Sequence, residues 1–225
     1  MPQSTIVIAD DDPHFRAVLK DAIGRHRPDA QVVEVSSLDT LQRAIAEHAN
    51  VALILLDLRI PGARGFSLLL YLKAEHPTIP VILVSVSDGP GIVQRALDFG
   101  ASGFIPKSAR ATAIGGVLRT VLGGGVAALR APNGHARIDL EDREAARRLA
   151  SLSIKKLKVL VQLADGHSNK YIAGHLAITE ATVKAHITGI LRTLGIERRT
   201  QAAILAQRLL QTGKHAEGNS LDDEG

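Results

Sequence analysis

Cysteine and tryptophan are both absent from the 225 residues of this chain. The lack of cysteine excludes disulfides, thiolate catalysis and metal sites with cysteine ligands, and it is typical of proteins of a reducing cytoplasm. Aromatic residues account for only 3% of the sequence, although hydrophobic residues of all kinds account for 45%. The hydrophobic cores must therefore be built mainly from Leu, Ile, Val and Ala.

Long hydrophobic runs are missing as well. The longest ones have the length of a β-strand, far below the roughly 20 residues that a membrane-spanning helix needs. The N-terminus starts polar and continues as a strand-like run, without the pattern of a signal peptide. From these absences we expect a soluble, cytoplasmic protein without a membrane partner.

The charges are distributed unevenly along the chain. Residues 1–122 contain 12 basic and 12 acidic residues, so this part is neutral, whereas residues 150–211 contain 9 basic and only 3 acidic residues. Residues 212–225 carry a net charge of −3. A neutral half joined to a basic half indicates two domains, the second of which faces a polyanion such as nucleic acid. An ordinary solvated basic surface is the alternative that charge alone leaves open.

Short apolar runs alternate with amphipathic segments of helical length through the first half. Five such strand–helix units predict a five-stranded, parallel, doubly wound sheet with helices on both faces. The run VALILLD at 51–57 does not alternate, so it is expected to form a central strand that is covered on both sides. The predicted strands are 5–9, 31–35, 52–56, 80–84 and 103–105, and the predicted helices lie near 13–25, 38–48, 65–75, 90–99 and 110–121.

The second half has a different organisation. Glycine, proline and Asn-Gly interrupt the periodic patterns, so we expect a flexible linker over 123–149 that can include a short helix near 139–151. Asp139 is the expected N-cap of this helix. The pattern then becomes helical, and a polar tail over 212–225 is expected to be disordered. Four helices are predicted near 153–164, 169–176, 180–194 and 200–210.

Acidic residues follow two of the predicted strands. Asp10, Asp11 and Asp12 come directly after the strand at 5–9, and Asp57 ends the run VALILLD. Functional groups of an open parallel sheet gather outside the carboxyl ends of its strands, so these residues are expected to share one edge. Clustered carboxylates suit a hard divalent cation such as Mg²⁺. Such a cation would relieve the repulsion and neutralise the oxygens of a phosphoryl group brought to an aspartate.

Two further polar residues come at the ends of the fourth and fifth strands. Ser85 supplies a hydroxyl and Lys107 an ammonium group, and both can bind the remaining oxygens of a phosphoryl group. Each residue has a simpler explanation when taken alone, because Ser85 would suit a turn, Lys107 a charged surface and Asp57 a strand-end turn. Asp12 precedes Pro13, which suits the first position of a helix, so we interpret Asp12 as a helix cap and not as a ligand.

The first half resembles the receiver domain of bacterial two-component response regulators over residues 4–122. The resemblance rests on the stretches IVIADDDPHFR, LLDLRIPGARG, VILVSVSD and GASGFIPKS. It implies a flavodoxin-like fold in which a histidine kinase phosphorylates Asp57. It also implies that Mg²⁺ is bound by Asp57, directly by Asp11, and through water by Asp10. The backbone carbonyl of Arg59 matches a further protein ligand.

The same resemblance assigns three more roles. Ser85 matches the switch hydroxyl, Phe104 the switch aromatic and Lys107 the invariant lysine of the family pattern. Phe104 also has a size that suits an ordinary core residue, which is the alternative for that position. A receiver domain accepts a phosphoryl group and loses it by self-catalysed hydrolysis, so no turnover of a separate substrate is expected.

The basic half contains the pattern of a helix-turn-helix. Ser153, Ser168 and Thr179 are placed to cap the first three of its helices, and only a short turn separates the helices at 169–176 and 180–194. In such a motif the second helix can enter the major groove of DNA, with its N-terminal residues facing the bases. The motif therefore predicts a DNA-binding domain.

This half resembles the LuxR/NarL-type DNA-binding domain over residues 150–211, through the stretch DGHSNKYIAGHLAITEATVKAHITGIL. The resemblance implies that Lys184, Ala185 and Thr188 read base edges. It also implies a homodimer on inverted half-sites when the protein is phosphorylated, with the helix at 200–210 as its dimerisation helix. The Ala and Leu residues of that helix suit the core of the helical domain equally well. The residues that match phosphate contacts, for which a solvated helix charge is the alternative, are Lys170, Thr182, Arg192 and Arg199.

Two positions depart from this second family pattern. Lys156 stands where the family has a glutamate that completes a capping box, and a lysine cannot close that box. Lys155, Lys156 and Lys158 are instead expected to attract phosphate groups without reading sequence. Tyr171 replaces the usual acid of the second helix. His186 matches a family histidine that we expect to hold the helices together or to contact the DNA backbone.

These patterns together predict a response regulator and transcription factor, in which phosphorylation at Asp57 by a histidine kinase controls dimerisation and sequence-specific binding to double-stranded DNA. One alternative is an orphan regulator that keeps the fold and works without phosphorylation. A second alternative is a Mg²⁺-dependent phosphohydrolase of the haloacid-dehalogenase type, which needs a second aspartate two residues after the first. Arg59 occupies that position here, and the five-unit domain lacks a cap insertion.

Overall fold

The computed structural model describes residues 4–63, 65–129 and 140–211. Its strands are β1 Thr5–Ala9, β2 Gln31–Val35, β3 Val51–Asp57, β4 Val81–Ser85, β5 Gly103–Pro106 and β6 Ala127–Ala128. In these described residues they form one parallel sheet with the order β2-β1-β3-β4-β5-β6. β3 lies between β1 and β4, as its unbroken apolar run predicts.

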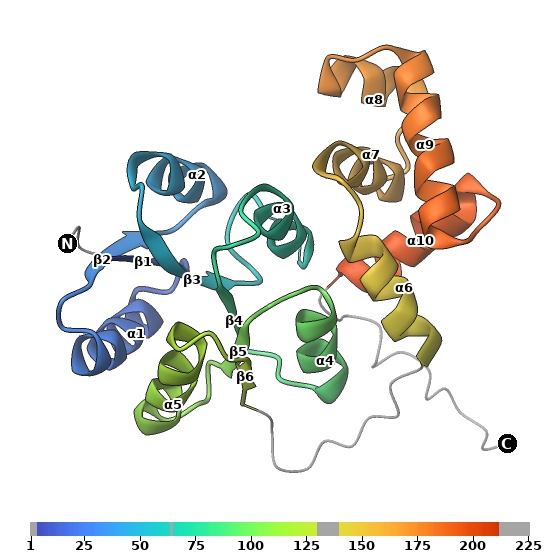
Figure 1. Cartoon of the computed structure of the whole chain (residues 1–225). Helices are drawn as coiled ribbons and strands as arrows, with labels where there is room; N and C mark the ends of the chain where they lie inside the picture. Colours follow the sequence, from blue (N-terminus) through green and yellow to red (C-terminus); the bar gives the residue numbers. More distant parts are fainter. Residues whose placement is uncertain (1–3, 64, 130–139, 212–225) are drawn as a thin grey trace, which may run out of the picture.

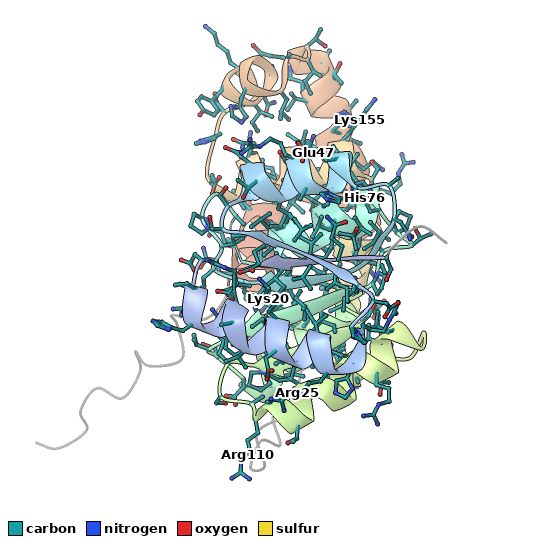
Figure 2. All side chains as sticks on the ribbon, turned by 90° about the vertical axis from the view of Figure 1, so that its left-hand side faces the viewer. Lys20, Arg25, Glu47, His76, Arg110 and Lys155 are labelled. Carbon is teal, nitrogen blue, oxygen red and sulfur yellow. The ribbon has the colours of Figure 1, made fainter. Side chains whose placement is uncertain are left out.

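Helices alternate with the strands and cover both faces of the sheet. They are α1 Pro13–His26, α2 Leu38–Glu47, α3 Ser67–Glu75, α4 Pro90–Asp98 and α5 Ala111–Leu122. α1 and α5 lie on one face, and α2, α3 and α4 lie on the other (Figure 1). Figure 2 views the sheet from the side of β2, with Lys20 and Arg25 of α1 on one side of it and Glu47 of α2 on the other.

Neighbouring residues of each strand point into different cores. Ile6 and Ile8 of β1 belong to the core beneath α1 and α5, whereas Val7 and Ala9 belong to the core beneath α2, α3 and α4. All four side chains are fully buried. A strand that is buried on both faces has no polar side, which explains why β1, β3 and β4 read as continuous apolar runs.

The short strand β6 corrects the prediction of a five-stranded sheet. The backbone N–H of Ala127 donates to the carbonyl of Ser102 at 3.1 Å, and that of Leu129 donates to the carbonyl of Phe104 at 2.9 Å. Gly103 makes this close pairing feasible, since a Cβ atom there would lie 2.8 Å from the carbonyl oxygen of Ala127. A strand of two residues is too short to show an alternating pattern, so periodicity could not reveal it.

The described residues of the basic half are helical. The helices are α6 Leu140–Ala150, α7 Ile154–Ala164, α8 Asn169–Leu176, α9 Glu180–Leu194 and α10 Arg199–Leu210. The Ser168 hydroxyl accepts from the N–H of Tyr171 at 3.2 Å, and the Thr179 hydroxyl accepts from the N–H of Thr182 at 3.1 Å. Both predicted caps are thus confirmed. Ala177 ends α8 in the left-handed conformation, with a φ of 54°, so that α9 can start three residues later.

The start of α7 differs from its prediction. Ser153 occupies the N-cap position, but its side chain makes no cap hydrogen bond within the described residues. Lys156 has no acceptor with which to complete a capping box, and its side chain lies against α9, where a Cβ on Gly189 would come within 2.9 Å of Lys156 Cε. The predicted cap of α6, Asp139, lies outside the described residues.

The two halves meet where α3 and α4 face α6, α7 and α10 (Figure 1). The last carbonyl groups of a helix have no partner within it, and here the first half supplies partners for those of α10. The N–H of Phe66 donates to the carbonyl of Leu210 at 3.0 Å. Arg95 Nη1 donates to three further carbonyl oxygens, at 3.2, 3.4 and 3.2 Å, those of Arg208, Leu209 and Gln211.

Other side chains complete this junction. The Phe66 ring packs edge-on against Phe99, with 5.3 Å between the ring centroids, and the Arg95 guanidinium lies 5.8 Å from the centroid of Phe66. Asp98 at the end of α4 forms ion pairs with Arg143 and Arg147 of α6, at 3.3 and 3.4 Å. These ion pairs attach α6 to the first half, and α6 also packs against α9 of the second half. No helix in the described residues is long and apolar enough to cross a membrane.

Candidate functional site

The predicted carboxylates meet at the carboxyl edge of the sheet. Asp57 ends β3 and Asp10 follows β1, and these strands are neighbours in which Ala9 pairs with Leu56. One carboxylate oxygen from each of Asp10, Asp11 and Asp57 lies within 4.8 Å of the others. Asp10 and Asp57 are only 1% and 3% exposed, whereas Asp11 is open to solvent. Three negative charges this close repel one another strongly unless cations separate them.

Lys107 provides one such cation. Its Nζ donates to Asp10 Oδ1 and to Asp57 Oδ2, both at 2.8 Å. Its backbone N–H donates to the carbonyl of Ser85 at 2.7 Å, which attaches the segment after β5 to the end of β4. Desolvation lowers the pKa of the Lys107 ammonium, but its hydrogen bonds to Asp10 and Asp57 and the attraction of their charges outweigh this effect, so the pKa is raised overall. Lys107 therefore stays charged throughout the physiological range.

One ammonium does not satisfy the whole cluster. Burial raises the pKa of the Asp10 carboxyl, although the hydrogen bond from Lys107 counteracts this effect. Asp10 Oδ2 is buried without a hydrogen-bond partner among the described residues. A buried oxygen in this condition is costly and needs an explanation. A divalent cation with a preference for oxygen ligands fits the three carboxylates, and a water molecule bound to it would give this atom a partner.

The remaining predicted groups lie at the same edge. Ser85 ends β4, where it is buried, and its hydroxyl accepts from the N–H of Ser87 at 3.1 Å. Phe104 of β5 is fully buried in the core beneath α2, α3 and α4. The N–H of Arg59 donates to Asp57 Oδ1 at 3.0 Å, while its side chain is exposed. The roles of all three residues in phosphoryl transfer stay predictions, including the Arg59 carbonyl as a metal ligand.

Asp12 has the separate role that was predicted for it. Its side chain accepts from the N–H groups of His14 and Phe15, at 2.9 and 3.4 Å, and Pro13 occupies the first position of α1. The bond from His14 is the main reason why the pKa of the Asp12 carboxyl is lowered. The third aspartate of the row is thus a helix cap.

Sequence reasoning missed two residues that border the cluster. Arg16 Nη1 donates to the backbone carbonyl of Asp10 at 2.7 Å. The Phe15 ring lies below the Lys107 ammonium, with 5.4 Å from Nζ to the ring centroid. Their spacing from the aspartates was visible in DDDPHFR, but periodicity assigns Phe15 simply to the apolar face of α1. Only the folded arrangement brings position 15 next to position 107.

The predicted base-reading residues lie on the free side of the second domain. Lys184, Ala185 and Thr188 are all exposed near the start of α9. Figure 1 shows α9 on the side of the helical domain that faces away from the sheet, with α7 between α9 and α3. The Thr188 hydroxyl donates to the carbonyl of Lys184 at 3.1 Å, so these residues share one helix face. The three side chains are therefore open to solvent on this helix face.

The predicted phosphate contacts differ in their surroundings. Lys170 and Arg192 are exposed, and Thr182 is half-buried beside the Thr179 cap. Arg199 is already engaged within the domain, because its guanidinium donates to Asn169 Oδ1 at 3.0 Å and to the carbonyl of His167 at 2.8 Å. These bonds hold the start of α8 against α10. For Arg199 a phosphate contact would thus come in addition to a structural role.

Two family models match the chain. The one described as "Response regulator receiver domain" matches residues 6–118, and the one described as "Bacterial regulatory proteins, luxR family" matches residues 150–206. A receiver domain followed by a LuxR-type DNA-binding domain defines a class of transcriptional regulators. The parallel sheet with its helices and the helical second domain agree with these two matches.

Known proteins share the whole arrangement. The chain is 37% identical over 207 residues to the glycerol metabolism activator of Pseudomonas putida, covering 89% of this chain and 94% of that one. It is 31% identical over 212 residues to the nitrate/nitrite response regulator NarP of Escherichia coli strain K12, covering 91% and 96%. RcsB of Salmonella enterica serovar Typhimurium, solved bound to a promoter, has the same fold, with a TM-score of 0.52 at 22% identity over 91% of this chain and 98% of that one. The chain therefore belongs to the NarL/LuxR-type response regulators.

Proposed function

We propose that this regulator accepts a phosphoryl group on Asp57 from a histidine kinase, and that phosphorylation controls its dimerisation and its sequence-specific binding to double-stranded DNA. The main observation behind this proposal is the incomplete hydrogen bonding of the carboxylates at the edge of the sheet. Lys107 binds both Asp10 and Asp57 at 2.8 Å, yet a buried oxygen of Asp10 still has no hydrogen-bond partner among the described residues. Such a site favours the binding of a further cation.

The residues around Asp57 suit nucleophilic attack by its carboxylate. The N–H of Arg59 orients Oδ1, and Lys107 holds Oδ2. A new O–P bond forms at Asp57 while the P–N bond to the kinase histidine breaks, and its electron pair stays on the imidazole. Lys107 and the Ser85 hydroxyl bind phosphoryl oxygens in the product. Attack by water on the acyl phosphate later releases inorganic phosphate, which is the self-catalysed hydrolysis.

Asp10, Asp11 and Asp57 would hold Mg²⁺, together with the Arg59 carbonyl. When bound there, Mg²⁺ supplies positive charge that neutralises the oxygens of the transferred phosphoryl group. The donor set supports this cation, since it consists of oxygens only and includes an unsatisfied one.

The second domain would bind DNA through the start of α9. Its net positive charge and the exposure of Lys184, Ala185 and Thr188 support base reading there, with Lys170, Thr182, Arg192 and Arg199 on phosphates. The promoter-bound structure of RcsB, which has the same fold, supports the same type of partner. We expect a homodimer on inverted half-sites, because the two-fold symmetry of a dimer matches that of such repeats. Because the chromosome is the target, the function would take place in the cytoplasm.

The domain limits that go with this function are 1–122 for the receiver, 123–149 for the linker, 150–211 for the DNA-binding domain and 212–225 for the tail. β6 lies within 123–149, and so does α6 apart from its last residue, Ala150, so part of the linker has regular structure. Residues 130–139 and the whole tail lie outside the described residues.

Labelling with a small phosphoryl donor tests the proposal. Wild-type protein with Mg²⁺ and acetyl phosphate should take up one phosphoryl group, and Asp57→Asn should take up none, as measured by intact mass. Full labelling of Asp57→Asn would refute the assignment. DNA footprinting with and without the donor then tests the control of binding. A footprint that does not depend on the donor would support the phosphorylation-independent alternative.

A further inference from the structure

Phe15 occupies a position that the known parts of the site do not explain. It belongs to the first turn of α1, is 7% exposed, and presents its ring to the Lys107 ammonium at 5.4 Å from Nζ to the centroid. A cation within about 6 Å of an aromatic centroid is attracted to the ring, and the attraction grows when both groups are shielded from water. The Lys107 side chain is only 11% exposed.

We propose that Phe15 is a positioning residue for phosphoryl transfer, whose ring holds the Lys107 ammonium beside the Asp57 carboxylate. The inference rests on the proposed function of Asp57 as the phosphoacceptor. Phe15 touches neither Asp57 nor the incoming group in this role, because it acts through Lys107.

The ring supplies a kind of contact that the other neighbours of Lys107 cannot supply. The ammonium donates to Asp10 and Asp57, and it must redirect a donor to a phosphoryl oxygen once Asp57 is modified. A third carboxylate would compete for that donor and hold the lysine in its resting position. An aromatic face attracts the positive charge without accepting a conventional hydrogen bond, so the donors remain available for the phosphoryl group.

The segment that supplies the carboxylates also determines where this ring lies. The N–H of Asp12 donates to Asp10 Oδ1 at 2.8 Å, and Asp12 Oδ1 in turn accepts from the N–H groups of His14 and Phe15. Two successive hydrogen bonds, from Asp12 to Asp10 and from Phe15 to Asp12, thereby link the backbone of Phe15 to Asp10. The ring also packs in the core beneath α1 and α5 together with Leu19 and Ile105. The helix cap thus has a consequence for the site, since it places an aromatic ring under the lysine.

Rates of labelling by acetyl phosphate at saturating Mg²⁺ test the inference on the full-length chain. Phe15→Leu keeps an apolar side chain but removes the aromatic face, and it should slow labelling about three- to tenfold. Phe15→Tyr keeps the face and should stay within about twofold of wild type. Leu19→Val, one turn further along the same helix, is the control for a general core defect and should leave the rate unchanged. Phe15→Met replaces Phe15→Leu if the latter does not fold.

A double-mutant cycle separates positioning from packing. Lys107→Ala removes the cation, so adding Phe15→Leu to it should cause no further loss of rate. A packing defect would slow labelling in both backgrounds by the same factor. Equal rates for Phe15→Leu and wild type, equal losses for Phe15→Leu and Phe15→Tyr, or an additive loss in the cycle would each overturn the inference. If wild-type protein takes up no phosphoryl group at all, the proposed function fails first, and the inference fails with it.

Discussion

The molecule contains two junctions built around a basic side chain, and they differ in how completely their polar groups are satisfied. At the carboxyl edge of the sheet, Lys107 serves two buried carboxylates and still leaves Asp10 Oδ2 without a partner among the described residues. At the junction of the two halves, Arg95 and the N–H of Phe66 together bind the carbonyls of residues 208–211 at the end of α10. The first cluster is short of positive charge, and the second is complete.

This difference indicates different purposes. Buried polar groups are normally satisfied, so a cluster that stays incomplete stores unfavourable free energy that a bound cation and a phosphoryl group can release. A saturated cluster has nothing to gain from a ligand, and its contribution is to stability and to the placement of the two halves. The planar guanidinium with its several donors suits the carbonyl-rich helix end, whereas the single ammonium of lysine can move between acceptors.

The largest effect is expected from filling the incomplete cluster. Mg²⁺ at about one hundred times its dissociation constant should raise the free energy of unfolding by about 2.7 kcal/mol, because only the folded chain assembles the three carboxylates. Asp11→Ala should lose most of this increase, while Asp12→Ala should keep it. Urea unfolding with and without MgCl₂ measures both. An Asp11→Ala variant that gains as much as wild type would place the cation elsewhere.

Breaking the complete cluster comes next. Arg95→Ala removes the donor for three carbonyls and should lower the free energy of unfolding by about 2 kcal/mol, the usual worth of hydrogen bonds from a charged group. The absence of native cysteine allows spin labels at Thr112→Cys and Thr200→Cys, one in each half. Their distance distribution should broaden in Arg95→Ala and stay narrow in the exposed control Arg119→Ala. A narrow distribution in both would show that other contacts hold the halves together.

A smaller effect is expected for the cap next to the incomplete cluster. Asp12→Ala leaves N–H groups at the start of α1 without their acceptor and should lower the melting temperature by about 2–4 °C. Asp12→Asn keeps an acceptor at the same place and should melt close to wild type. Circular dichroism measures the transitions. If Asp12→Ala were no longer stabilised by Mg²⁺, Asp12 would be a ligand of the cation and not only a cap.

The smallest effect concerns the pH dependence of the metal-free protein. Burial raises the folded-state pKa of Asp10 above its ordinary value of 3.8, so the folded chain keeps this proton longer than the unfolded chain. Stability should therefore fall as the pH rises from about 4 through the folded-state pKa. Asp10→Asn removes this titration and should gain a few tenths of a kcal/mol at pH 7. Urea unfolding at several pH values in EDTA measures how the free energy of unfolding depends on pH. The same pH dependence in wild type and in Asp10→Asn would contradict the prediction.

Much of the fold was accessible from local patterns. Unbroken apolar runs identified β1, β3 and β4, and helical periodicity identified α7 to α10, because burial on two faces or on one stripe leaves a regular trace in the chain. Asp12, Ser168 and Thr179 correctly predicted the starts of their helices, because a cap depends on contacts between residues only two or three positions apart. β6 was not predicted, because two residues cannot show a periodic pattern. Ser153 lies at the N-cap of α7 as predicted, but its side chain makes no cap hydrogen bond within the described residues, because a suitable residue type does not ensure one.

The candidate site likewise has one part that the sequence predicts and another part that only the folded sheet determines. That carboxylates from two strands share an edge follows from the rule that parallel strands end together, so Asp10, Asp11 and Asp57 could be placed in advance. The register of Ala9 with Leu56 and of Ser85 with Pro106 brings the groups within bonding distance, and strand register depends on contacts across the whole sheet. Residue types and local spacing thus determine the helices, the caps and the family of this regulator. Three features arise only in the folded chain: the Phe15 ring beside Lys107, the buried oxygen of Asp10 without a partner among the described residues, and the hydrogen bonds from Arg95 to the end of α10. Each depends on positions that are distant in sequence and that only packing brings together.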